Sequence, residues 1–384
     1  MGLLGLSGCG SPSSASMETS SEAASEVTRT AETSQEEQTK LVKTGSMELQ
    51  YAENFTVDYY EGGYKLLTTL PDDKRYLLVP EGQGVPADLD EDICVLQEPL
   101  QNIYLVASGV MDMFASLDAV DQIRFSGQKQ ENWYIQTAKD AMAAGDMIYA
   151  GKYSKPDYEL LVSEGCDLAI ENRMITHSPE VVEMLQSFDI PVMIEYSSYE
   201  QHPLGKVEWV KFFGALTGKE AKAEEAFAEQ TEILEEVESG EKTGKTIAFF
   251  YVTSNGLIQV RQSTDYIPKL IELAGGRYIF ENLEDSGSGR STLNMQVEDF
   301  YAGAKDADIL IYNSSIDGGV TTVDELIGKC NILKDFKAVQ EGQVYCTTND
   351  MYQQSMAVGY LLQDMHTVLT DDDTAKLRYL FLLQ

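Results

Sequence analysis

The chain contains no run of about 20 apolar residues, the length that a membrane-spanning helix needs. Basic residues are scarce, because 28 lysines and arginines stand against 63 aspartates and glutamates, and the net charge is −35. Such a surface repels phosphate backbones, which argues against nucleic-acid binding. The three histidines, His177, His202 and His366, are too few and too far apart to predict a zinc or manganese site, which disfavours a receptor for the free ions.

Motifs of common enzyme classes are also missing. The sequence has no GxSxG nucleophile motif and no HExxH zinc motif. The stretch SGEKTGKT (239–246) ends like a phosphate-binding loop, but Ser239 occupies a position that needs glycine, and a predicted helix precedes the stretch instead of following it. No catalytic residue is therefore predicted. The alternative to a non-catalytic protein is an extracytoplasmic α/β enzyme or a chelatase-like protein with carboxylates in a cleft. This alternative stays open, because catalytic residues that only folding brings together leave no sequence motif.

Four cysteines follow Cys9, without CxxC or zinc-like spacing. Cys166 and Cys346 stand beside apolar runs, so we expect buried free thiols at these two positions. The sequence does not show whether they, or Cys94 and Cys330, form disulfides.

The first 44 residues differ in composition from the rest. Residues 10–44 are rich in Ser, Thr, Glu and Ala, which predicts a disordered tether. Before them, Leu6-Ser7-Gly8-Cys9 resembles a bacterial lipobox. This resemblance implies that residues 1–9 end a lipoprotein signal and that Cys9 carries lipid, which would anchor the protein on the outer face of the cytoplasmic membrane. Only eight residues precede Cys9 and none is basic. We therefore expect either that the true start codon lies upstream or that the signal peptide has been trimmed.

A helix, a glycine and a second, longer helix are predicted over residues 203–240. Pro203 suits a first helical turn, and Gly218 suits the position after a helix end. The second helix carries one narrow apolar stripe among many glutamates, formed by Ala223, Phe227, Leu234 and Val237. A helix of this kind is typical of a strut between two lobes, and the alternative is a surface helix within one large domain.

The chain is also long enough for two lobes, because its 384 residues exceed the roughly 250–300 that a single core supports. We expect an N-terminal lobe at 45–205, an interdomain helical spine at 206–244 and a C-terminal lobe at 245–384 with a closing helix.

Strand and helix patterns alternate on both sides of this spine. The N-terminal half shows strand-like stretches at 55–59, 64–67 and 76–79, then apolar strands at 102–108, 166–170 and 190–196 with helices at 111–117, 134–144 and 178–188. The C-terminal half shows strands at 246–252, 277–280, 308–312 and 343–346 with helices at 265–274, 297–304, 323–327 and 355–369. Ser178 is the predicted cap of one helix. Apolar strands separated by helices indicate parallel sheets covered on both faces. The predicted fold is therefore α/β, with two Rossmann-like lobes of parallel sheets joined by one long interdomain helix.

One pattern occurs once in each half. Glu159 precedes Asp167 by eight residues and Glu298 precedes Asp308 by ten, and each aspartate opens an apolar strand. Both glutamates are thus expected early on a helix that leads into a core strand. Taken alone, the pattern is explained by favourable charge near a helix N-terminus, which is worth about 0.3–1 kcal/mol.

Together with the spine and the lipobox, this paired pattern resembles the substrate-binding proteins of bacterial ABC importers for iron complexes, haem and cobalamin, in the class with a single-helix hinge. The resemblance covers about residues 45–369. It implies a monomeric, non-catalytic protein that captures an iron–siderophore, haem or corrinoid-type complex without a cofactor of its own and closes its lobes only modestly. It also implies that Glu159 and Glu298 dock onto arginines of the ABC permease dimer.

This chain departs from the family pattern before the two strands. The usual Pro-Asp pair is Cys166-Asp167 in the first half and Ala307-Asp308 in the second. The stretches SSYEQHPLGKVEW and GKYSKPDYE look like a clostridial-type branch of the family.

Cargo contacts are expected in the loops after the carboxyl ends of the strands, where parallel sheets bind ligands. The residues that we select there, or in a polar stretch nearby, are Ser108, Met111, Trp133, Tyr134, Arg173, His177, Tyr199, His202, Arg261, Arg290 and Tyr352. Aromatic rings would stack on the complex, and each arginine offers a fixed fork for its carboxylates. Each arginine is also compatible with a surface ion pair, and His202 with a helix cap. Cargo that touches Tyr199 or His202 would lie against the spine.

Overall fold

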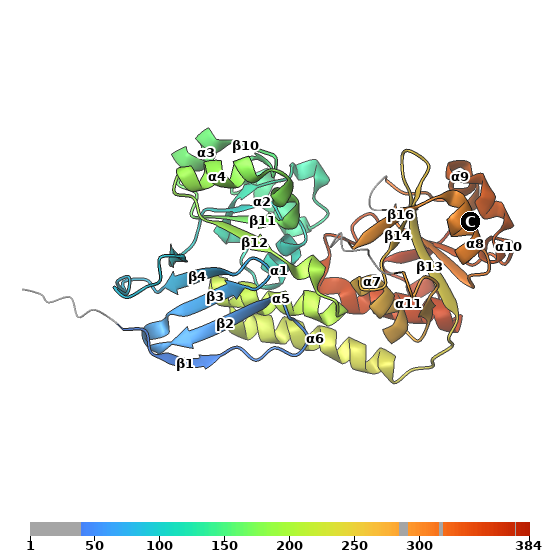
Figure 1. Cartoon of the computed structure of the whole chain (residues 1–384), viewed down its shortest axis with the longest axis horizontal. Helices are drawn as coiled ribbons and strands as arrows, with labels where there is room; N and C mark the ends of the chain where they lie inside the picture. The colour runs from blue at the N-terminus through green and yellow to red at the C-terminus, as the bar shows by residue number, and fades with distance from the viewer. Residues whose placement is uncertain (1–39, 284–290, 315–317, 373) are drawn as a thin grey trace, which may run out of the picture. The chain divides into compact units, whose positions relative to one another are not determined.

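The structure is a computed structural model and describes residues 40–283, 291–314, 318–372 and 374–384. Within this part, three main sheets of five, five and seven strands are combined with eleven α-helices (Figure 1). Cys9, most of the predicted tether, and Arg290 lie outside the described residues.

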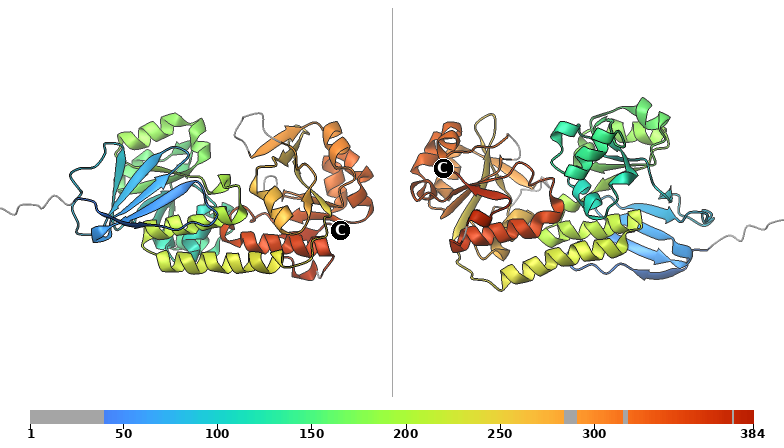
Figure 2. Two further views of the ribbon diagram at one scale, coloured as in Figure 1. Left: turned by 60° about the horizontal axis from the view of Figure 1, so that its bottom comes forward. Right: turned by 180° about the vertical axis from the view of Figure 1, so that it is seen from behind.

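The predicted helix–glycine–helix unit is confirmed. α5 (Pro203–Thr217) begins after His202, whose Nδ1 accepts a hydrogen bond from the Leu204 N–H at 3.2 Å, and it ends at Gly218 with a left-handed φ of 69°. α6 (Glu220–Glu238) follows and lies along α5 (Figure 2). The buried residues of α6 are the four predicted apolar ones, Ala223, Phe227, Leu234 and Val237, and also Gln230.

α5 is the more enclosed of these two helices. All its residues from 203 to 216 are buried, including the aromatic rings of Trp209, Phe212 and Phe213. The rings of Trp209 and Phe212 contact Phe55 of β2 (Phe55–Tyr60), with centroids 4.9 and 5.3 Å away. A helix that is buried all round is a core element. The sequence analysis placed the strut on α6, whereas α5 is the helix that the neighbouring elements surround.

Two buried glutamates attach the N-terminal chain to α5. Glu208 is fully buried, and its carboxylate accepts hydrogen bonds from the backbone N–H groups of Gln50, Tyr51 and Ala52 at 2.8–3.1 Å. Glu200, just before the helix, accepts from the backbone of residues 53 and 54 and from the Trp209 indole at 2.8–3.0 Å. Five successive backbone N–H groups therefore depend on two carboxylates.

The early strand-like stretches form a sheet of their own. Its strands are β1 (Lys43–Ser46), β2, β3 (Lys65–Thr69), β4 (Lys74–Val79) and β5 (Ile93–Gln97), in the order β1-β2-β3-β4-β5. All pairs are antiparallel except β4 with β5. This sheet contacts α5 through β2 and β3.

The next sheet is parallel throughout, as predicted. Its strands are β6 (Ile103–Leu105), β7 (Ile123–Ser126), β8 (Ile148–Tyr149), β11 (Leu168–Asn172) and β12 (Val192–Glu195), in the order β12-β11-β6-β7-β8. The helices between them are α1 (Val110–Ser116), α2 (Gln136–Ala144), α3 (Tyr158–Ser163) and α4 (Pro179–Ser187), and a short hairpin joins β9 (Gly151–Lys152) to β10 (Lys155–Pro156). Leu105 and Ile170 face one apolar core while Tyr104 and Ala169 face another, so the sheet is covered on both sides. Ser178 precedes α4 as predicted, but its side chain makes no capping hydrogen bond.

The C-terminal sheet is mixed, which the sequence analysis did not predict. Its strands are β13 (Thr246–Val252), β14 (Ile258–Arg261), β15 (Arg277–Tyr278), β16 (Thr292–Met295), β17 (Ile309–Tyr312), β18 (Val344–Thr347) and β19 (Leu380–Leu382). β13, β15, β17 and β18 are parallel, whereas β14, β16 and β19 pair antiparallel. The helices are α7 (Tyr266–Leu273), α8 (Val297–Ala304), α9 (Val323–Lys329), α10 (Lys337–Gln340) and α11 (Val358–Thr370). The antiparallel start follows from a tight turn at Gly256, whose φ of 78° returns the chain from β13 directly into β14.

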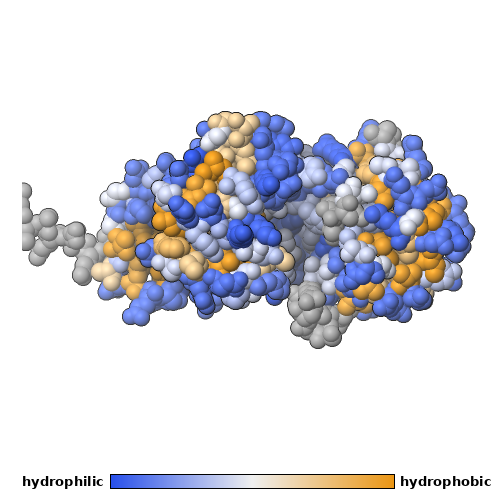
Figure 3. All heavy atoms as spheres, turned by 90° about the horizontal axis from the view of Figure 1, so that it is seen from above, coloured by the Kyte–Doolittle hydropathy of each residue, from blue (hydrophilic) through white to orange (hydrophobic). Residues whose placement is uncertain are grey.

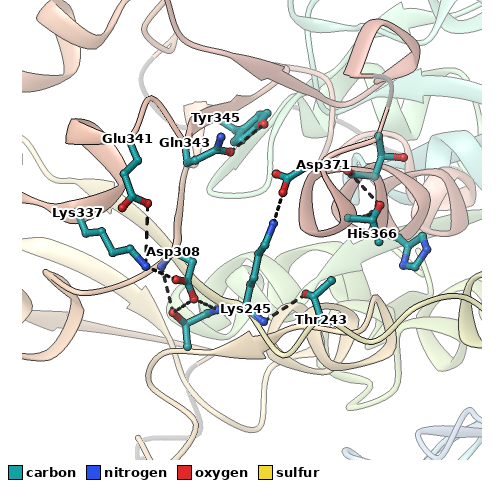
Figure 4. A network of polar contacts seen from close by, with 12 residues as sticks. Thr243, Lys245, Asp308, Lys337, Glu341, Gln343, Tyr345, His366 and Asp371 are labelled. Atoms are coloured by element: carbon teal, nitrogen blue, oxygen red, sulfur yellow. Dashed lines mark hydrogen bonds and ion pairs between the residues drawn. The ribbon is translucent and has the colours of Figure 1, made fainter.

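The two α/β lobes share one device at equivalent places. Asp167, before β11, accepts hydrogen bonds from the backbone N–H groups of Gln101 and Asn102 at 2.9 and 2.8 Å, at the start of β6. Asp308, before β17, accepts from the N–H and hydroxyl of Thr246 at 2.7 and 2.8 Å, at the start of β13. Asp308 also pairs with Lys337 at 2.5 Å (Figure 4). Each aspartate thus fixes the start of the neighbouring parallel strand, without the proline that usually precedes it in the family it resembles.

A second buried carboxylate lies in β11 and has no such partners. Glu171 is fully buried, and neither of its oxygens has a hydrogen-bond donor among the described residues. Burial raises the pKa of Glu171 to about 8. The folded protein therefore binds this proton more tightly than the unfolded chain does.

Removal of the Glu208 carboxylate should destabilise the fold strongly. We expect Glu208→Ala to lower the free energy of unfolding by roughly 3–5 kcal/mol, because three backbone donors and the Lys211 ammonium lose a buried acceptor. Urea denaturation of the purified chain measures this. Glu224→Ala removes the exposed partner of Lys211 and should cost at most about 1 kcal/mol. Equal losses in the two variants would contradict the role of Glu208.

Glu171 should make stability depend on pH. Folding raises the pKa of Glu171, so ionisation of its carboxyl is costly in the folded protein. The free energy of unfolding therefore falls as pH rises from about 4.5 to about 8 and stays lower above that range. We expect Glu171→Gln to remove this dependence. The unfolding free energy of the variant minus that of the wild type should therefore be roughly 2–4 kcal/mol larger at pH 9 than at pH 5. Urea denaturation at several pH values tests this, with Glu183→Gln on the exposed face of α4 as control. A constant difference between Glu171→Gln and wild type would disprove it.

Candidate functional site

A cavity of about 250 Å³ lies where loops from the two α/β lobes meet. The residues that line it are Ala107, Ser108, Gly109, Asn172, Arg173, Met174, Glu195, Ser198, Tyr199, Lys206, Arg261, Asp265, Tyr266, Ser291 and Tyr352. The first lobe contributes the loops that follow β6, β11 and β12, as expected for the carboxyl ends of parallel strands. In the space-filling view, the two halves of the molecule are separated by a hollow with hydrophilic residues beside it (Figure 3).

On the first lobe, the cavity wall contains a cation stacked on an aromatic ring. The Arg173 guanidinium lies 4.6 Å from the ring centroid of Tyr199. Asn172, the last residue of β11, caps the following 3-10 turn by accepting a hydrogen bond from the Met174 N–H at 2.8 Å. Tyr199 is 39% exposed, so its ring is accessible from the cavity side. Ser108, Arg173 and Tyr199 lie at this wall, where the sequence analysis expected cargo contacts.

The opposite wall is held together by Arg261. Its guanidinium pairs with Asp265 at 3.4 Å and donates a hydrogen bond to the hydroxyl of Tyr352. The same hydroxyl accepts from Asn313 Nδ2 at 2.8 Å. Arg261 and Tyr352 were both selected from the sequence, but their mutual contact was not predicted, because 91 residues separate them.

Several other selected residues lie away from this cavity. Met111 and Trp133 are fully buried in the apolar core, and the Trp133 indole donates to Ser126 Oγ at 3.0 Å. The polar surroundings of Trp133 in the sequence therefore misled the prediction, since the ring turns inward. Tyr134 and His177 are exposed and do not line the cavity. His202 caps α5 and stacks on Tyr51 at 4.4 Å, in a separate cavity of about 370 Å³.

Four charged or aromatic residues of the wall, Lys206, Glu195, Asp265 and Tyr266, were not selected from the sequence. Lys206 lies in the first turn of α5, with its ammonium 4.9 Å from the ring of Tyr266 at the start of α7. A signal for Lys206 was present, because charged residues interrupt an otherwise apolar helix at 206, 208 and 211. Tyr266 gave no such signal, since its role depends on how α7 packs against α5.

The cavity is more positive than the chain as a whole. Three cations, Arg173, Lys206 and Arg261, line it together with two carboxylates. Burial raises the pKa of Glu195 and of Asp265, and Asp265 is already paired with Arg261. The arrangement can therefore bind an anionic group, in a protein whose net charge is −35.

Direct contacts join the lobes beside the cavity. The Gln353 carboxamide accepts a hydrogen bond from the Tyr134 N–H and donates one to the Asn132 carbonyl, both at 2.8 Å. Asp112 of α1 accepts from the Met356 N–H at 2.7 Å. Burial raises the pKa of Asp112 to about 6. Tyr352 of the cavity wall directly precedes Gln353 and lies four residues before Met356, so these contacts hold the same segment of the second lobe against the first.

The two glutamates of the repeated pattern lie at equivalent places. Glu159 and Glu298 each occupy the second position of their helix, α3 and α8, and both are exposed. Within the described residues neither carboxylate makes an ion pair within 4.0 Å. α3 leads into β11 and α8 into β17, the strands that pair with β6 and β13.

The described residues include potential metal ligands and four cysteines. There, no three His, Cys, Asp or Glu side chains converge in a set that could hold a metal ion. Among the same residues, Cys94, Cys166 and Cys330 are free thiols. Cys346 is buried as predicted, whereas Cys166 is partly exposed instead of buried. In the same residues, no helix is both long and apolar enough to cross a membrane.

A family model described as periplasmic binding protein matches residues 105–351. An uncharacterized lipoprotein of Methanocaldococcus jannaschii is 24% identical over 351 residues, which cover 84% of this chain and 81% of that protein. The solved structure of a periplasmic heme binding protein of Vibrio cholerae gives a TM-score of 0.55 at 14% identity, covering 70% of this chain and 98% of that one. A periplasmic catecholate-siderophore binding protein of the same organism gives 0.55 at 12% identity, covering 72% and 95%. At these identities the structural likeness is one of fold.

Proposed function

Because this chain belongs to the periplasmic binding protein family, we propose that it is an extracytoplasmic, lipid-anchored substrate-binding protein that delivers a metal–organic complex to an ABC permease. The cargo would be an iron–siderophore, haem or corrinoid-type complex. The observation that carries this proposal is the cavity between the lobes, which combines three cations with the rings of Tyr199, Tyr266 and Tyr352.

The chemistry of the cavity fits binding without covalent steps. Tyrosine rings offer apolar faces with a polar tip, and arginine and lysine offer charges for the acidic groups that such complexes carry. Two of the solved structures with this fold are named as heme and catecholate-siderophore binding proteins, which supports a cargo of this class. We propose no catalytic role for any residue.

The proposed location depends on the N-terminal residues. Leu6-Ser7-Gly8-Cys9 resembles a lipobox, and the relative from Methanocaldococcus jannaschii is named as a lipoprotein. Lipid on Cys9 would anchor the lobes outside the cell through the tether. The tether is shorter at its C-terminal end than the predicted 10–44, because Lys43 and Thr44 belong to β1. This location is where a binding protein meets both its cargo and its permease.

Titration with candidate complexes tests the proposed cargo class. The full chain with Cys9→Ser is titrated with haem, cobalamin, a ferric tricatecholate and a neutral ferric trihydroxamate, and the visible absorbance is followed. We expect at least one complex to bind with a Kd of about 1 μM or tighter. Tyr199→Ser should weaken that binding roughly 3- to 10-fold, because a ring is lost from the cavity wall. Tyr149→Ser is the matched control, since Tyr149 is 41% exposed but lies outside the cavity. Failure of all four complexes to bind would contradict the proposal.

The docking role proposed for Glu159 and Glu298 follows from their matching positions. Each lobe carries one exposed carboxylate at the second position of the helix that leads into its central strand. A symmetric permease dimer would therefore make one contact with each lobe. Helix-dipole stabilisation is the competing explanation, and it applies equally to Glu180 and Asp324, which occupy the second positions of α4 and α9. The neighbouring helices thus supply a matched control.

A transport assay separates these explanations. We expect the double variant Glu159→Ala/Glu298→Ala to keep its affinity for the complex found above and to lower uptake by whole cells at least about 10-fold, since removal of charged contacts at an interface costs 1–2 kcal/mol or more. Glu180→Ala/Asp324→Ala should leave uptake within about 2-fold of the wild type, because exposed charges contribute little. Normal uptake in the Glu159/Glu298 variant would remove the docking assignment.

A further inference from the structure

Two buried lysines on α5 allow a direct comparison. Lys206 and Lys211 are each 4% exposed and lie on the same helix. The ammonium of Lys206 is 4.9 Å from the ring centroid of Tyr266, and that of Lys211 is 4.6 Å from the ring of Phe227. Burial and aromatic contact are therefore matched, so a difference in the charged partners of the two side chains is informative.

The difference lies in their acidic partners. Lys211 pairs with Glu224 at 2.9 Å and with Glu208 at 3.6 Å. Within the described part of the chain, the Lys206 ammonium has no carboxylate within 4.0 Å and donates no hydrogen bond. Lys206 is thus a buried cation that the protein itself leaves without an ion-pair partner.

Three carboxylates that interact electrostatically with Lys206 make their hydrogen bonds to other groups. Glu195 accepts hydrogen bonds from the Ser197 N–H at 2.8 Å and from the Ser197 hydroxyl at 2.5 Å. Asp265 accepts from the Ile267 N–H at 3.0 Å and pairs with Arg261, and Asp112 accepts from the Met356 N–H. The charge of Lys206 lowers the pKa of all three carboxyl groups, but their oxygens accept hydrogen bonds at turns and helix ends and form no ion pair with Lys206.

The position of Lys206 is unfavourable for a structural lysine. It lies in the first turn of a 15-residue helix, where the positive end of the helix dipole disfavours a cation. Burial removes most of its hydration, and an unpaired buried charge is costly. Lys206 nevertheless lines the cavity, so an anion placed there would remove both penalties at once.

We propose that Lys206 is the anchor for an anionic oxygen of the cargo, a carboxylate or a phenolate, held in the cavity beside the ring of Tyr266 and against α5. This inference rests on the proposed function and narrows it, because it selects complexes that carry a negative charge over neutral ones. Arg261 contributes less to this selection, since Asp265 and Tyr352 already occupy its guanidinium.

Methionine replacements of the two lysines test the anchor. Both are made in the full chain with Cys9→Ser, and the probes are an anionic ferric tricatecholate, haem with its two propionates, and a neutral ferric trihydroxamate. Lys206→Met should weaken binding of the anionic complexes roughly 10- to 100-fold and change the neutral one by less than about 3-fold. Lys211→Met should leave all affinities unchanged.

Urea denaturation without cargo gives a second readout, because replacement of a lysine with a merely structural role would lower the stability of the fold. We expect Lys206→Met to unfold at the same or a higher urea concentration than the wild type, whereas Lys211→Met, which strands Glu208, should unfold at a lower one. If Lys206→Met is as destabilised as Lys211→Met and binds every probe as the wild type does, Lys206 is structural and the inference fails. Binding of the neutral complex alone would also overturn the anchor and leave the proposed function standing. Binding of no complex would overturn the proposed function itself.

Discussion

The complete burial of α5 is the constraint on which the rest of the molecule depends. A charge on a helix enclosed on all sides is costly without a partner. Glu208 and Lys211 have partners in the backbone of residues 50–52 and in Glu224, whereas Lys206 has no ion-pair partner among the described residues. Close approach also limits which residues fit. A side chain at Gly205 would place its Cβ 2.9 Å from the Tyr51 carbonyl, and one at Gly214 would lie 2.6 Å from Ala223. These contacts attach both the N-terminal sheet and α6 to one central helix.

The two lobes on either side of this helix solve the same problem in the same way. In each, an aspartate before a central strand holds the start of the next parallel strand, as Asp167 and Asp308 do. Fixed strand starts bring the carboxyl ends of the strands to one edge, and the loops there form the cavity wall. The repeated strand arrangement therefore gives the chain both the fold of its family and the loops that form the cavity wall.

The sequence analysis was most accurate where short-range chemistry decides the structure. The helix stop at Gly218, the strand at 246–252 and the helix at 297–304 follow from local propensity and apolar pattern, and the structure has them at those residues. It was least accurate where a residue depends on distant partners. Trp133 lies in a polar stretch, yet its ring is buried against Ser126. β14 and β16 escaped notice because each is only four residues long, and β16 pairs with a strand more than 30 residues earlier in the chain.

Of the cavity wall, Ser108, Arg173, Tyr199, Arg261 and Tyr352 could be selected from the sequence, because they lie in loops after apolar strands or stand out as cations in an acidic chain. Lys206, Glu195, Asp265 and Tyr266 were not selected, because their local sequence does not show that the start of α5, the end of β12 and the start of α7 meet at the cavity. By itself, the sequence determined the α/β class, the helical unit at 203–240 and the paired glutamates, all of which depend on residues close together in the chain. Only the tertiary structure decided that α5, and not α6, is the enclosed helix, and that its first buried lysine faces the cavity while its second is paired, because these outcomes depend on packing between distant segments.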